Sequence, residues 1–324
     1  MRAEQSTVPD PLRPTLNEAV DIIRHGGVVA MPTETVYGLA ADARNKAAVA
    51  RVFALKQRPL DHPLIVHLAS AEEMDTWAAS VPPVAKRLAA TAWPGPLTLV
   101  LRARDDVPRQ VTGGQDTVAL RVPDHPLALA LIRGSGGALV APSANRFGQL
   151  SPTCAEHVLQ GFGETPPPVL DGGPCRVGIE SSVVLVDDAG WQVLRPGHWT
   201  EAALEHIART APLVTERELP RTPGQLASHY APHTPLILLP DRAAVLATAT
   251  SKDGLLLFGS PAPTTTAASS VVLANTPELA AQQLYAALHH LDAMGRQRIL
   301  AEQPPAGSEW AAIRDRLQRA QMLG

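Results

Sequence analysis

Cysteine is scarce in this chain of 324 residues, which contains only Cys154 and Cys175. Two cysteines cannot build the disulfide framework of a small secreted domain. They also lack the spacing of metal ligands, and no cluster of aspartate, glutamate or histidine residues supplies it. The sequence therefore predicts neither a disulfide scaffold nor a metal ion held by protein ligands.

Long apolar runs are lacking too. No segment approaches the roughly 18 apolar residues of a membrane-spanning helix, and the first residues, MRAEQSTVPDPLRPT, lack the apolar core of a signal peptide. With 45% hydrophobic residues and a mean hydropathy near zero, the composition is that of a globular protein in water. We therefore expect a cytoplasmic protein with no membrane segment.

There is no excess of positive charge. Lysine and arginine number 28 against 31 aspartates and glutamates, a formal net charge of −3. A protein that binds nucleic acid through its overall charge is usually basic, so any such role would need a local basic patch.

Several well-known catalytic motifs are also missing. The chain contains no Walker A sequence, no GxSxG and no HExxH, and its last third has no GxGxxG. The sequence therefore disfavours a P-loop nucleotidase, a serine hydrolase and a zinc protease, and it gives no support for dinucleotide binding in the last third.

What the sequence does contain is two blocks of alternating helical and strand patterns. Residues 1–215 form the first block, a mixed α/β pattern with many strands. The proline-rich stretch 216–235, ERELPRTPGQLASHYAPHTP, is typical of a linker. Residues 236–324 alternate strands and helices, which predicts a small parallel, Rossmann-like sheet. A length of 324 residues also favours two domains over one.

The expected elements follow from hydrophobic periodicity and from turn residues. Helices are predicted at 16–25, 46–56, 71–79, 83–92, 125–133, 241–249, 277–293 and 308–323. Strands are predicted at 28–32, 63–69, 97–103, 118–124, 181–187, 191–197, 236–240, 254–259 and 270–274, with a further strand running into a polar loop within 137–145.

The stretch KQRPLDHPLIVH (56–67) concentrates cationic and titratable side chains where a helix meets an apolar strand. Lys56 and Arg58 lie at the end of the predicted helix, and two prolines stiffen the backbone beyond it. A stiff loop can hold cations against a phosphate, although cations are also common in a last helical turn because they complement the helix dipole. His67, inside the strand, is by position alone more often a core residue than a catalyst.

A second polar cluster lies in VAPSANRFGQLSPT (140–153), where a strand leads into Ser143, Asn145 and Ser151. Short hydrogen-bonding side chains of this kind, with backbone N–H groups, bind phosphate or amino-acid oxygens. The same stretch also fits a plain polar turn in which the serine of SPT caps a helix with proline at its first position.

Further polar residues follow other apolar strands. MPTETVYGLAAD (31–42) places Glu34 and Thr35 after a buried strand, at the kind of loop where α/β proteins bind ligands. GIESSVV (178–184) supplies Ser181, and LRPG (194–197) supplies Arg195. Arg121, within the apolar strand VALRVPD, needs an anionic partner or a sheet end.

Taken together, these segments resemble the threonylcarbamoyl-AMP synthase family in its long, two-domain form. The matching motifs occur in order: PTETVYGL, KQRPLDHPLIVH, PGPLTLVL, TVALRVPDHP, APSAN with SPT, GIESSVV, LRPG and HYAP. They span residues 32–232 and are specific as a set. The resemblance implies a YrdC-like α/β fold, an open twisted mixed sheet with a large concave cavity, followed by a smaller Rossmann-like C-terminal α/β domain.

The resemblance also implies a reaction. L-threonine, bicarbonate and ATP would give threonylcarbamoyl-adenylate and pyrophosphate, and a downstream tRNA threonylcarbamoyltransferase complex would receive the adenylate to make threonylcarbamoyladenosine in tRNA. Because carboxylate, carbamate and triphosphate gather negative charge in one cavity, positioning and electrostatic stabilisation should dominate over covalent catalysis. Mg²⁺ would accompany ATP through its phosphates, and direct tRNA binding would be weak or absent.

The resemblance assigns roles to individual residues. Lys56 and Arg58 would be catalytic and would neutralise the phosphates and the carbamate. The threonine-binding residues would be Thr35, His67, Arg121, Ala141 and Ser181, with Arg121 holding the carboxylate bidentately. The ATP-binding residues would be Arg58, His62, Thr117, Ser143, Asn145, Ser151, Arg195, His229 and Tyr230. The last two belong to HYAP in the linker and would close over the nucleotide.

The chain departs from the family pattern in three places. His62 stands where the family usually has asparagine, and Ser182 replaces the customary threonine of the GIEST pattern. NRFGQLSPT also differs from the commoner sequence of small residues before SPT.

Three other interpretations stay open on sequence alone. The chain could be a tRNA- or double-stranded-RNA-binding module without turnover. It could perform carbamoyl-adenylate chemistry, as hydrogenase maturation proteins with a related domain do, although their acylphosphatase and zinc-finger segments are not recognisable here. It could also bind a regulatory ligand, in which case it would not turn over ATP.

Overall fold

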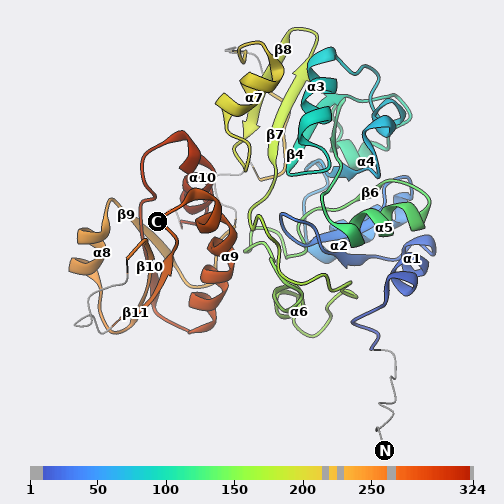
Figure 1. Cartoon of the computed structure of the whole chain (residues 1–324). Coiled ribbons are helices and arrows are strands. Elements are labelled where there is room, and N and C mark those ends of the chain that lie inside the picture. Colours follow the sequence, from blue (N-terminus) through green and yellow to red (C-terminus); the bar gives the residue numbers. More distant parts are fainter. Residues whose placement is uncertain (1–9, 214–218, 225–229, 261–267, 322–324) are drawn as a thin grey trace, which may run out of the picture.

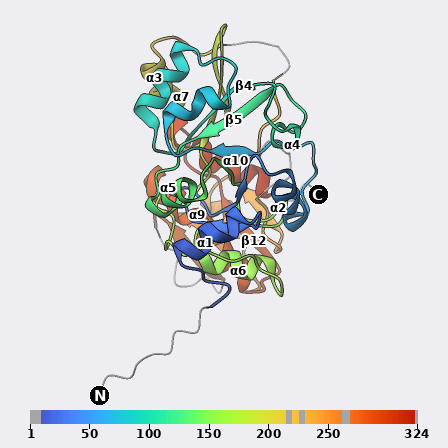
Figure 2. The ribbon, with the colours of Figure 1, turned by 90° about the vertical axis from the view of Figure 1, so that its right-hand side faces the viewer.

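The computed structural model describes residues 10–213, 219–224, 230–260 and 268–321. Within these residues the chain forms two lobes, each built on its own sheet (Figure 1). Turned by 90°, the first lobe lies in front, and α9 and α10 of the second lobe lie behind it (Figure 2). The division into a mixed α/β domain and a smaller parallel α/β domain confirms the predicted fold class.

The helices of the first lobe are α1 (Leu16–Arg24), α2 (Lys46–Lys56), η1 (Ala71–Thr76, a 3₁₀ helix), α3 (Pro83–Ala92), α4 (Arg109–Thr112), α5 (Pro126–Ser135), α6 (Ala155–Phe162) and α7 (Glu201–Ala208). Its strands are β1 (Val29–Met31), β2 (Gly38–Asp42), β3 (Ile65–His67), β4 (Leu97–Arg102), β5 (Thr117–Arg121), β6 (Leu139–Val140), β7 (Ser182–Asp187) and β8 (Gly190–Arg195).

These eight strands form one mixed sheet in the order β1-β2-β6-β3-β5-β4-β7-β8. The parallel pairing of β3 with β5 places His67 directly opposite Arg121, where both strands end. Two residues that are 54 positions apart in sequence therefore meet at one edge of the sheet, which is where the site lies.

Local sequence signals set the ends of the helices that lead toward this edge. Asn45 caps α2 by accepting hydrogen bonds from the backbone N–H groups of Ala47 and Ala48. At the other end Gln57 adopts a left-handed conformation, with φ 53° and ψ 41°. This turn ends the helix after Lys56 and directs Arg58 toward the strand β3.

The second lobe has a sheet of four parallel strands in the order β11-β10-β12-β9. Its strands are β9 (Leu236–Leu239), β10 (Asp253–Phe258), β11 (Ser269–Leu273) and β12 (Arg298–Glu302), and its helices are α8 (Arg242–Thr248), α9 (Pro277–Ala293), η2 (Ser308–Trp310, a 3₁₀ helix) and α10 (Ala311–Ala320). The all-parallel pairing confirms the predicted Rossmann-like sheet.

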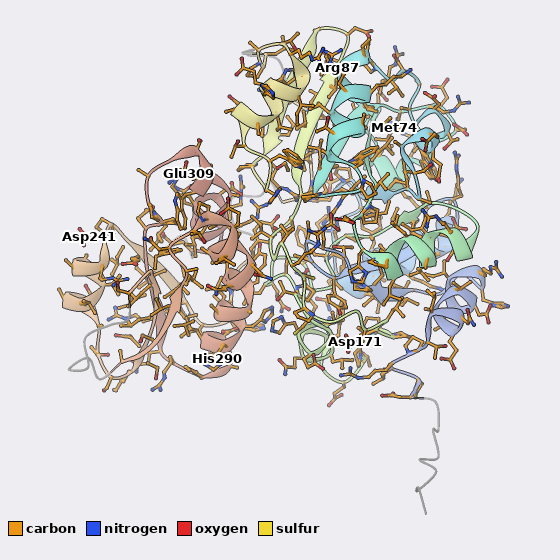
Figure 3. All side chains as sticks on the ribbon, viewed as in Figure 1. Met74, Arg87, Asp171, Asp241, His290 and Glu309 are labelled. Atoms are coloured by element: carbon orange, nitrogen blue, oxygen red, sulfur yellow. The ribbon has the colours of Figure 1, made fainter. Side chains whose placement is uncertain are left out.

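The two lobes share a continuous apolar core. One cluster of buried side chains joins Val36, Ile179 and Tyr230 to Leu284 of α9 and Ile313 of α10. Side chains fill the contact between the lobes, whereas Asp241 lies on the outer side of the second lobe (Figure 3). The first lobe therefore buries part of its surface only when the second lobe is folded against it.

Some predicted elements were wrong or incomplete. The helix expected at 71–79 is a 3₁₀ helix that ends at Thr76. The serine of SPT does not cap a helix, because α6 begins at Ala155 with Cys154 at its N-cap position. The strands β2 and β12 and the helices α4 and α7 were not predicted. Among the described residues, no helix is both long enough and apolar enough to cross a membrane.

Candidate functional site

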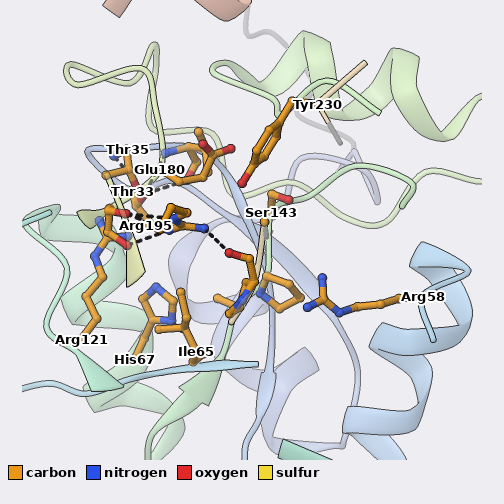
Figure 4. A pocket seen from close by; sticks show the side chains of 16 residues that line it. Thr33, Thr35, Arg58, Ile65, His67, Arg121, Ser143, Glu180, Arg195 and Tyr230 are labelled. Atoms are coloured by element: carbon orange, nitrogen blue, oxygen red, sulfur yellow. Dashed lines mark hydrogen bonds between the residues drawn. The ribbon is translucent and has the colours of Figure 1, made fainter. Parts of the chain in front are cut away.

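A pocket lies at the edge of the first sheet where β3 and β5 end, and it is covered by residues that follow the first domain (Figure 4). Arg58 and Arg121 reach toward it from opposite sides. Its lining consists of Thr33, Thr35, Val36, Arg58, Ile65, His67, Arg121, Ala141, Pro142, Ser143, Glu180, Ser181, Arg195, Pro223, Gly224 and Tyr230.

The predicted residues fall into three groups. Those that line the pocket are Thr35, Arg58, His67, Arg121, Ala141, Ser143, Ser181, Arg195 and Tyr230. Those that lie elsewhere are Lys56, His62, Thr117, Asn145 and Ser151. His229 and part of the predicted linker lie outside the described residues.

Arg121 has the anionic partner that its sequence position required. Its Nη2 atom lies 2.6 Å from Glu34 Oε1, and both side chains are almost fully buried. Glu34 Oε2 accepts a hydrogen bond from the backbone N–H of Asp124, and Arg121 Nε donates one to the carbonyl of Gly95. The guanidinium is thus fixed from behind, at the edge of the pocket.

His67 is neutral in this environment. Burial, with the nearby Arg121 charge, lowers the pKa of His67 to about 3. Its Nδ1 lies 3.3 Å from the carbonyl oxygen of Ile65, which can only accept a hydrogen bond. Nδ1 therefore carries the proton, and Nε2 is left as an acceptor for an N–H or O–H group.

Thr33 organises the loop that presents Thr35. The hydroxyl of Thr33 donates to the carbonyl of Val36 at 2.6 Å and accepts from the backbone N–H of Thr35 at 3.1 Å. The two threonine hydroxyls lie 2.9 Å apart, and since Thr33 has used its proton, Thr35 is the donor between them. Thr35 Oγ1 is thereby left to act as an acceptor toward the pocket.

Arg195 ties three segments together around Ser181. Its Nε and Nη2 atoms donate to the carbonyl of Ser181 at 3.1 and 2.9 Å, and Nη1 donates to the carbonyl of Pro223 at 2.8 Å. The Ser181 hydroxyl also lies 2.8 Å from Thr98 Oγ1 of β4. A single guanidinium thus joins β8, the GIESS loop and the segment that covers the pocket.

Arg58 enters the pocket with its charge largely desolvated. Burial lowers its pKa to about 10, and repulsion from Arg195 contributes in the same direction. Nη2 donates to the carbonyl of Pro63 at 2.9 Å, and the guanidinium lies 5.6 Å from the Phe147 ring. A desolvated cation gains most from an anionic ligand, because little solvation remains to be lost on binding.

Lys56 lies behind the pocket wall. Its Nζ donates to the carbonyls of Ser143 and Asn145 at 2.5 and 2.7 Å, while its own carbonyl accepts from the N–H of Phe147. Asn145 Nδ2 closes the same loop by donating to the carbonyls of Arg146 and Gln149. Lys56 therefore fixes the APSAN loop that carries Ser143 into the pocket.

His62 and Thr117 stand farther from the pocket. His62 lies beside Arg58, with its ring 5.2 Å from that of Phe147, and burial lowers its pKa below the usual value. Thr117 begins β5, four residues before Arg121, which is roughly 13 Å along a strand.

Ser151 belongs to a buried network around Glu180 that sequence reasoning missed. Ser151 Oγ donates to Glu180 Oε1 at 2.5 Å, and Arg316 Nε donates to Oε2 at 2.7 Å. The Tyr285 hydroxyl lies 3.1 Å from both carboxylate oxygens. Glu180 lines the pocket, whereas Tyr285 and Arg316 come from α9 and α10 of the second lobe. A signal existed for Arg316, which interrupts the apolar face formed by Ile313, Leu317 and other buried residues of α10.

The described residues offer no protein site for a metal ion. No group of three or more histidine, cysteine, aspartate or glutamate side chains is placed to hold one within the ranges that the structure covers. The carboxylate in the pocket wall, that of Glu180, is already hydrogen-bonded to three donors. A divalent cation at this site would therefore depend on ligand oxygens.

The pocket is small. It encloses about 50 Å³, against the roughly 300–1,000 Å³ of sites that bury drug-sized ligands. Tyr230, with φ 62°, places its hydroxyl so close to Gly224 that any β-carbon there would overlap it. A ligand of nucleotide size requires this cover to shift.

Comparison with known proteins gives matches over nearly the whole chain. Residues 21–197 match the family described as Telomere recombination (Sua5_yciO_yrdC), and residues 199–321 match the one described as Threonylcarbamoyl-AMP synthase, C-terminal domain. A threonylcarbamoyl-AMP synthase of Pyrococcus abyssi is 39% identical over 318 residues, which are 93% of this chain and 92% of that protein. One of Bacillus subtilis is 45% identical over 231 residues, 69% of this chain and 66% of that protein.

The fold is similar to a solved structure as well. The crystal structure of P. abyssi Sua5 complexed with L-threonine aligns with a TM-score of 0.85 at 37% identity, covering 94% of this chain and 93% of that one.

Proposed function

This chain belongs to the threonylcarbamoyl-AMP synthase family, and from that membership we propose that its pocket joins L-threonine, bicarbonate and ATP into threonylcarbamoyl-adenylate with release of pyrophosphate. The observation that carries the proposal is the pocket itself. Arg58 and Arg121 enter it from opposite sides, and neutral acceptors and hydroxyls lie between them. Two substrates could thus bind through their anionic groups with their reacting ends facing each other.

On one side we assign the threonine pocket to Thr35, His67, Arg121, Ala141 and Ser181. Arg121, held by Glu34, would bind the threonine carboxylate. His67 Nε2 and Thr35 Oγ1 are acceptors, and they suit the ammonium or hydroxyl hydrogens of threonine. Oriented in this way, the deprotonated amine would attack the carbon of bicarbonate, water would leave, and the resulting carbamate would turn an oxygen toward the nucleotide.

On the other side we assign nucleotide binding to Arg58, His62, Thr117, Ser143, Asn145, Ser151, Arg195, His229 and Tyr230. The carbamate oxygen would attack the α-phosphorus, and the bond to the pyrophosphate oxygen would break. Arg58 would stabilise the charge that develops in this step, and Lys56 would act with it by fixing the APSAN loop. When bound with ATP, Mg²⁺ would neutralise phosphate charge, held by the phosphates rather than by protein carboxylates.

His62 fits the position where the family usually has asparagine because its pKa is lowered. At neutral pH it is uncharged and offers one donor and one acceptor, as an amide side chain does. We therefore propose that His62 replaces the amide contact instead of adding a third cation beside Arg58.

We propose that the linker 216–235 between domains 1–215 and 236–324 acts as a lid. Pro223, Gly224 and Tyr230 line the pocket, and Arg195 binds the carbonyl of Pro223. Closing this cover after the substrates enter would keep water from the labile adenylate.

The product would pass to a tRNA threonylcarbamoyltransferase complex in the cytoplasm. Both cysteines are free, which is consistent with a reducing compartment. Because the net charge is −3, we expect direct tRNA binding to be weak or absent.

The proposal is tested by pyrophosphate release with ATP, bicarbonate and each amino acid in turn, with mass-spectrometric detection of the adenylate. We expect release that depends on threonine and bicarbonate. Release that is independent of threonine, or RNA binding without any turnover, would overturn it.

A further inference from the structure

The second domain contacts the pocket wall at the carboxylate of Glu180, a residue of the first domain. Glu180 is 6% exposed and has three hydrogen-bond partners: Ser151 of the first domain, and Tyr285 and Arg316 of the second. Arg316 is itself 1% exposed and also donates to Asp315 and to the carbonyl of Pro196. Two of the three groups that orient a pocket residue therefore come from a different domain.

The charge of Glu180 depends on these partners. A carboxylate buried to this extent is strongly disfavoured without a countercharge. Although burial alone would raise the pKa of Glu180, the Arg316 and Arg195 charges outweigh it and hold that pKa at about 2. As an anion, Glu180 can only accept hydrogen bonds, so Ser151 must point its proton at Glu180 and turn its lone pairs elsewhere.

Arg316 also supports the cover of the pocket. Its guanidinium lies 5.2 Å from the centre of the Tyr230 ring, and the Tyr230 and Tyr285 rings are 5.9 Å apart. An arginine over a tyrosine ring is attracted by the negative face of the ring. The same side chain thus contacts both the Glu180 carboxylate and the residue that closes the pocket.

The backbone at Gly178 determines how closely α9 packs against the GIESS loop. Gly178, two residues before Glu180, has φ +78°, and a β-carbon there would overlap the backbone of Gln282 in α9. Only glycine allows α9 to approach the GIESS loop this closely. The distance between Glu180 and Tyr285 is therefore fixed by helix packing and not by flexible side chains alone.

We propose that Arg316 and Tyr285 are positioning residues of the active site, through which the second domain sets the nucleotide-binding geometry. They orient Glu180, which fixes Ser151, and Arg316 supports Tyr230. The inference rests on the proposed function in that Ser151 and Tyr230 are taken as nucleotide contacts. Thr35, His67 and Arg121 of the threonine side lie on β3, β5 and the loop after β1, whereas the hydrogen bonds and ring contact of Arg316 go to Glu180, Asp315, Pro196 and Tyr230.

The test compares Arg316→Met with Arg319→Met, the same change on the same helix at a residue that pairs with Asp315. We expect Arg316→Met to raise the KM for ATP at least tenfold and the KM for threonine less than threefold, and Arg316→Lys to recover part of the loss by restoring the charge. For Arg319→Met, the KM for ATP and the KM for threonine should both stay within twofold of the wild-type values. An unchanged KM for ATP in Arg316→Met, or equal rises for both substrates, would overturn the inference.

Arg316→Met leaves a buried carboxylate without its main partner and could fail to fold. Glu180→Gln keeps the volume without the charge, and Arg316 keeps Asp315 as a countercharge at 2.6 Å. We expect Glu180→Gln to fold and to show the same rise in KM for ATP, without a comparable rise in KM for threonine. A wild-type KM for ATP would refute the positioning role.

Nucleotide binding separates this inference from the proposed function. Calorimetric titration with a non-hydrolysable ATP analogue should show at least tenfold weaker binding for Glu180→Gln than for Arg319→Met. If the wild type released no pyrophosphate with threonine, the proposed reaction would be wrong. The ratio of the two variants' affinities for the ATP analogue would still test the positioning role. Equal binding by the two variants would overturn the positioning role even in an enzyme that makes the adenylate.

Discussion

His67 shows at the residue scale how this pocket controls charge. The folded protein keeps the imidazole neutral down to about pH 3, whereas the unfolded chain takes up a proton below about pH 6.5. The stability linked to His67 is therefore fully present above about pH 6.5 and is lost as the pH falls toward 3. The slope is at most about 1.4 kcal/mol per pH unit.

His67→Gln should remove this dependence. Between pH 6.5 and 5 we expect the free energy of unfolding of the wild type to fall, relative to the variant, by up to about 2 kcal/mol. Urea denaturation at pH 7, 6 and 5 measures the difference, with His206→Gln at an exposed position as the control. Parallel curves for the wild type and His67→Gln would show that the pKa of the imidazole is the same in the folded and the unfolded chain.

The residue scale also shows what the sequence could and could not predict. A charge in an apolar strand needs an anion, so a partner for Arg121 was predictable, but Glu34 as that partner depends on how the loop folds back. The family resemblance predicts that Lys56 neutralises the phosphates and the carbamate. In the structure its Nζ atom donates to two carbonyls of a loop some 90 residues away in sequence. No local pattern contains that information.

At the scale of elements, Lys56 connects the end of α2 to the APSAN loop. Lys56→Met would remove a buried amine whose pKa is lowered by desolvation, but it would leave two carbonyls without a donor. We therefore expect the free energy of unfolding to change by no more than about 2 kcal/mol. Turnover should fall at least 100-fold, because Ser143 loses its support. Hydrogen exchange should quicken at Asn145 and Phe147.

Lys46→Met, at the exposed start of the same helix, is the matched control and should leave stability, turnover and hydrogen exchange unchanged. Wild-type turnover in Lys56→Met would exclude any catalytic or positioning role for this lysine.

The cover of the pocket depends on Gly224. Its φ of +84° and its contact with Tyr230 leave no room for a side chain, so Gly224→Ala should displace Tyr230. We expect a KM for ATP at least tenfold higher and a lower yield of adenylate per pyrophosphate released, because water reaches the intermediate. Gly136→Ala tests φ alone, since Gly136 has φ +82° and a β-carbon there would meet nothing within 4 Å. If the two variants behaved alike, backbone strain and not the Tyr230 contact would explain the effect.

Elements with strong apolar runs were predictable, and the weaker ones were not. β3 and β5 were predicted because IVH and TVALR lie in apolar, β-branched segments. β2 was missed because GLAAD is rich in alanine and follows a polar loop, and it is held by pairing on both sides. The missed helix α7 did carry a signal, since Thr200 caps it by accepting from Ala203 N–H.

At the scale of the whole molecule, the shared core and the Glu180 network should make the two domains unfold together. We expect one calorimetric transition for the wild type, and for Arg316→Met a separation into two or a clear loss of cooperativity. The control Arg319→Met should keep the single transition. Two separate transitions in the wild type would mean that the interface contributes little to stability.

The position of Arg316 near the end of the chain has a consequence for biosynthesis. Arg316 is 136 residues beyond Glu180, and a ribosome adding about 5–20 residues per second needs on the order of ten seconds to cover that distance. During that interval the first domain has emerged with a carboxylate that lacks its principal countercharge. A ribosome that stalls or stops before α10 would release a chain whose pocket is unfinished, so only a chain translated beyond α10 would hold a competent site.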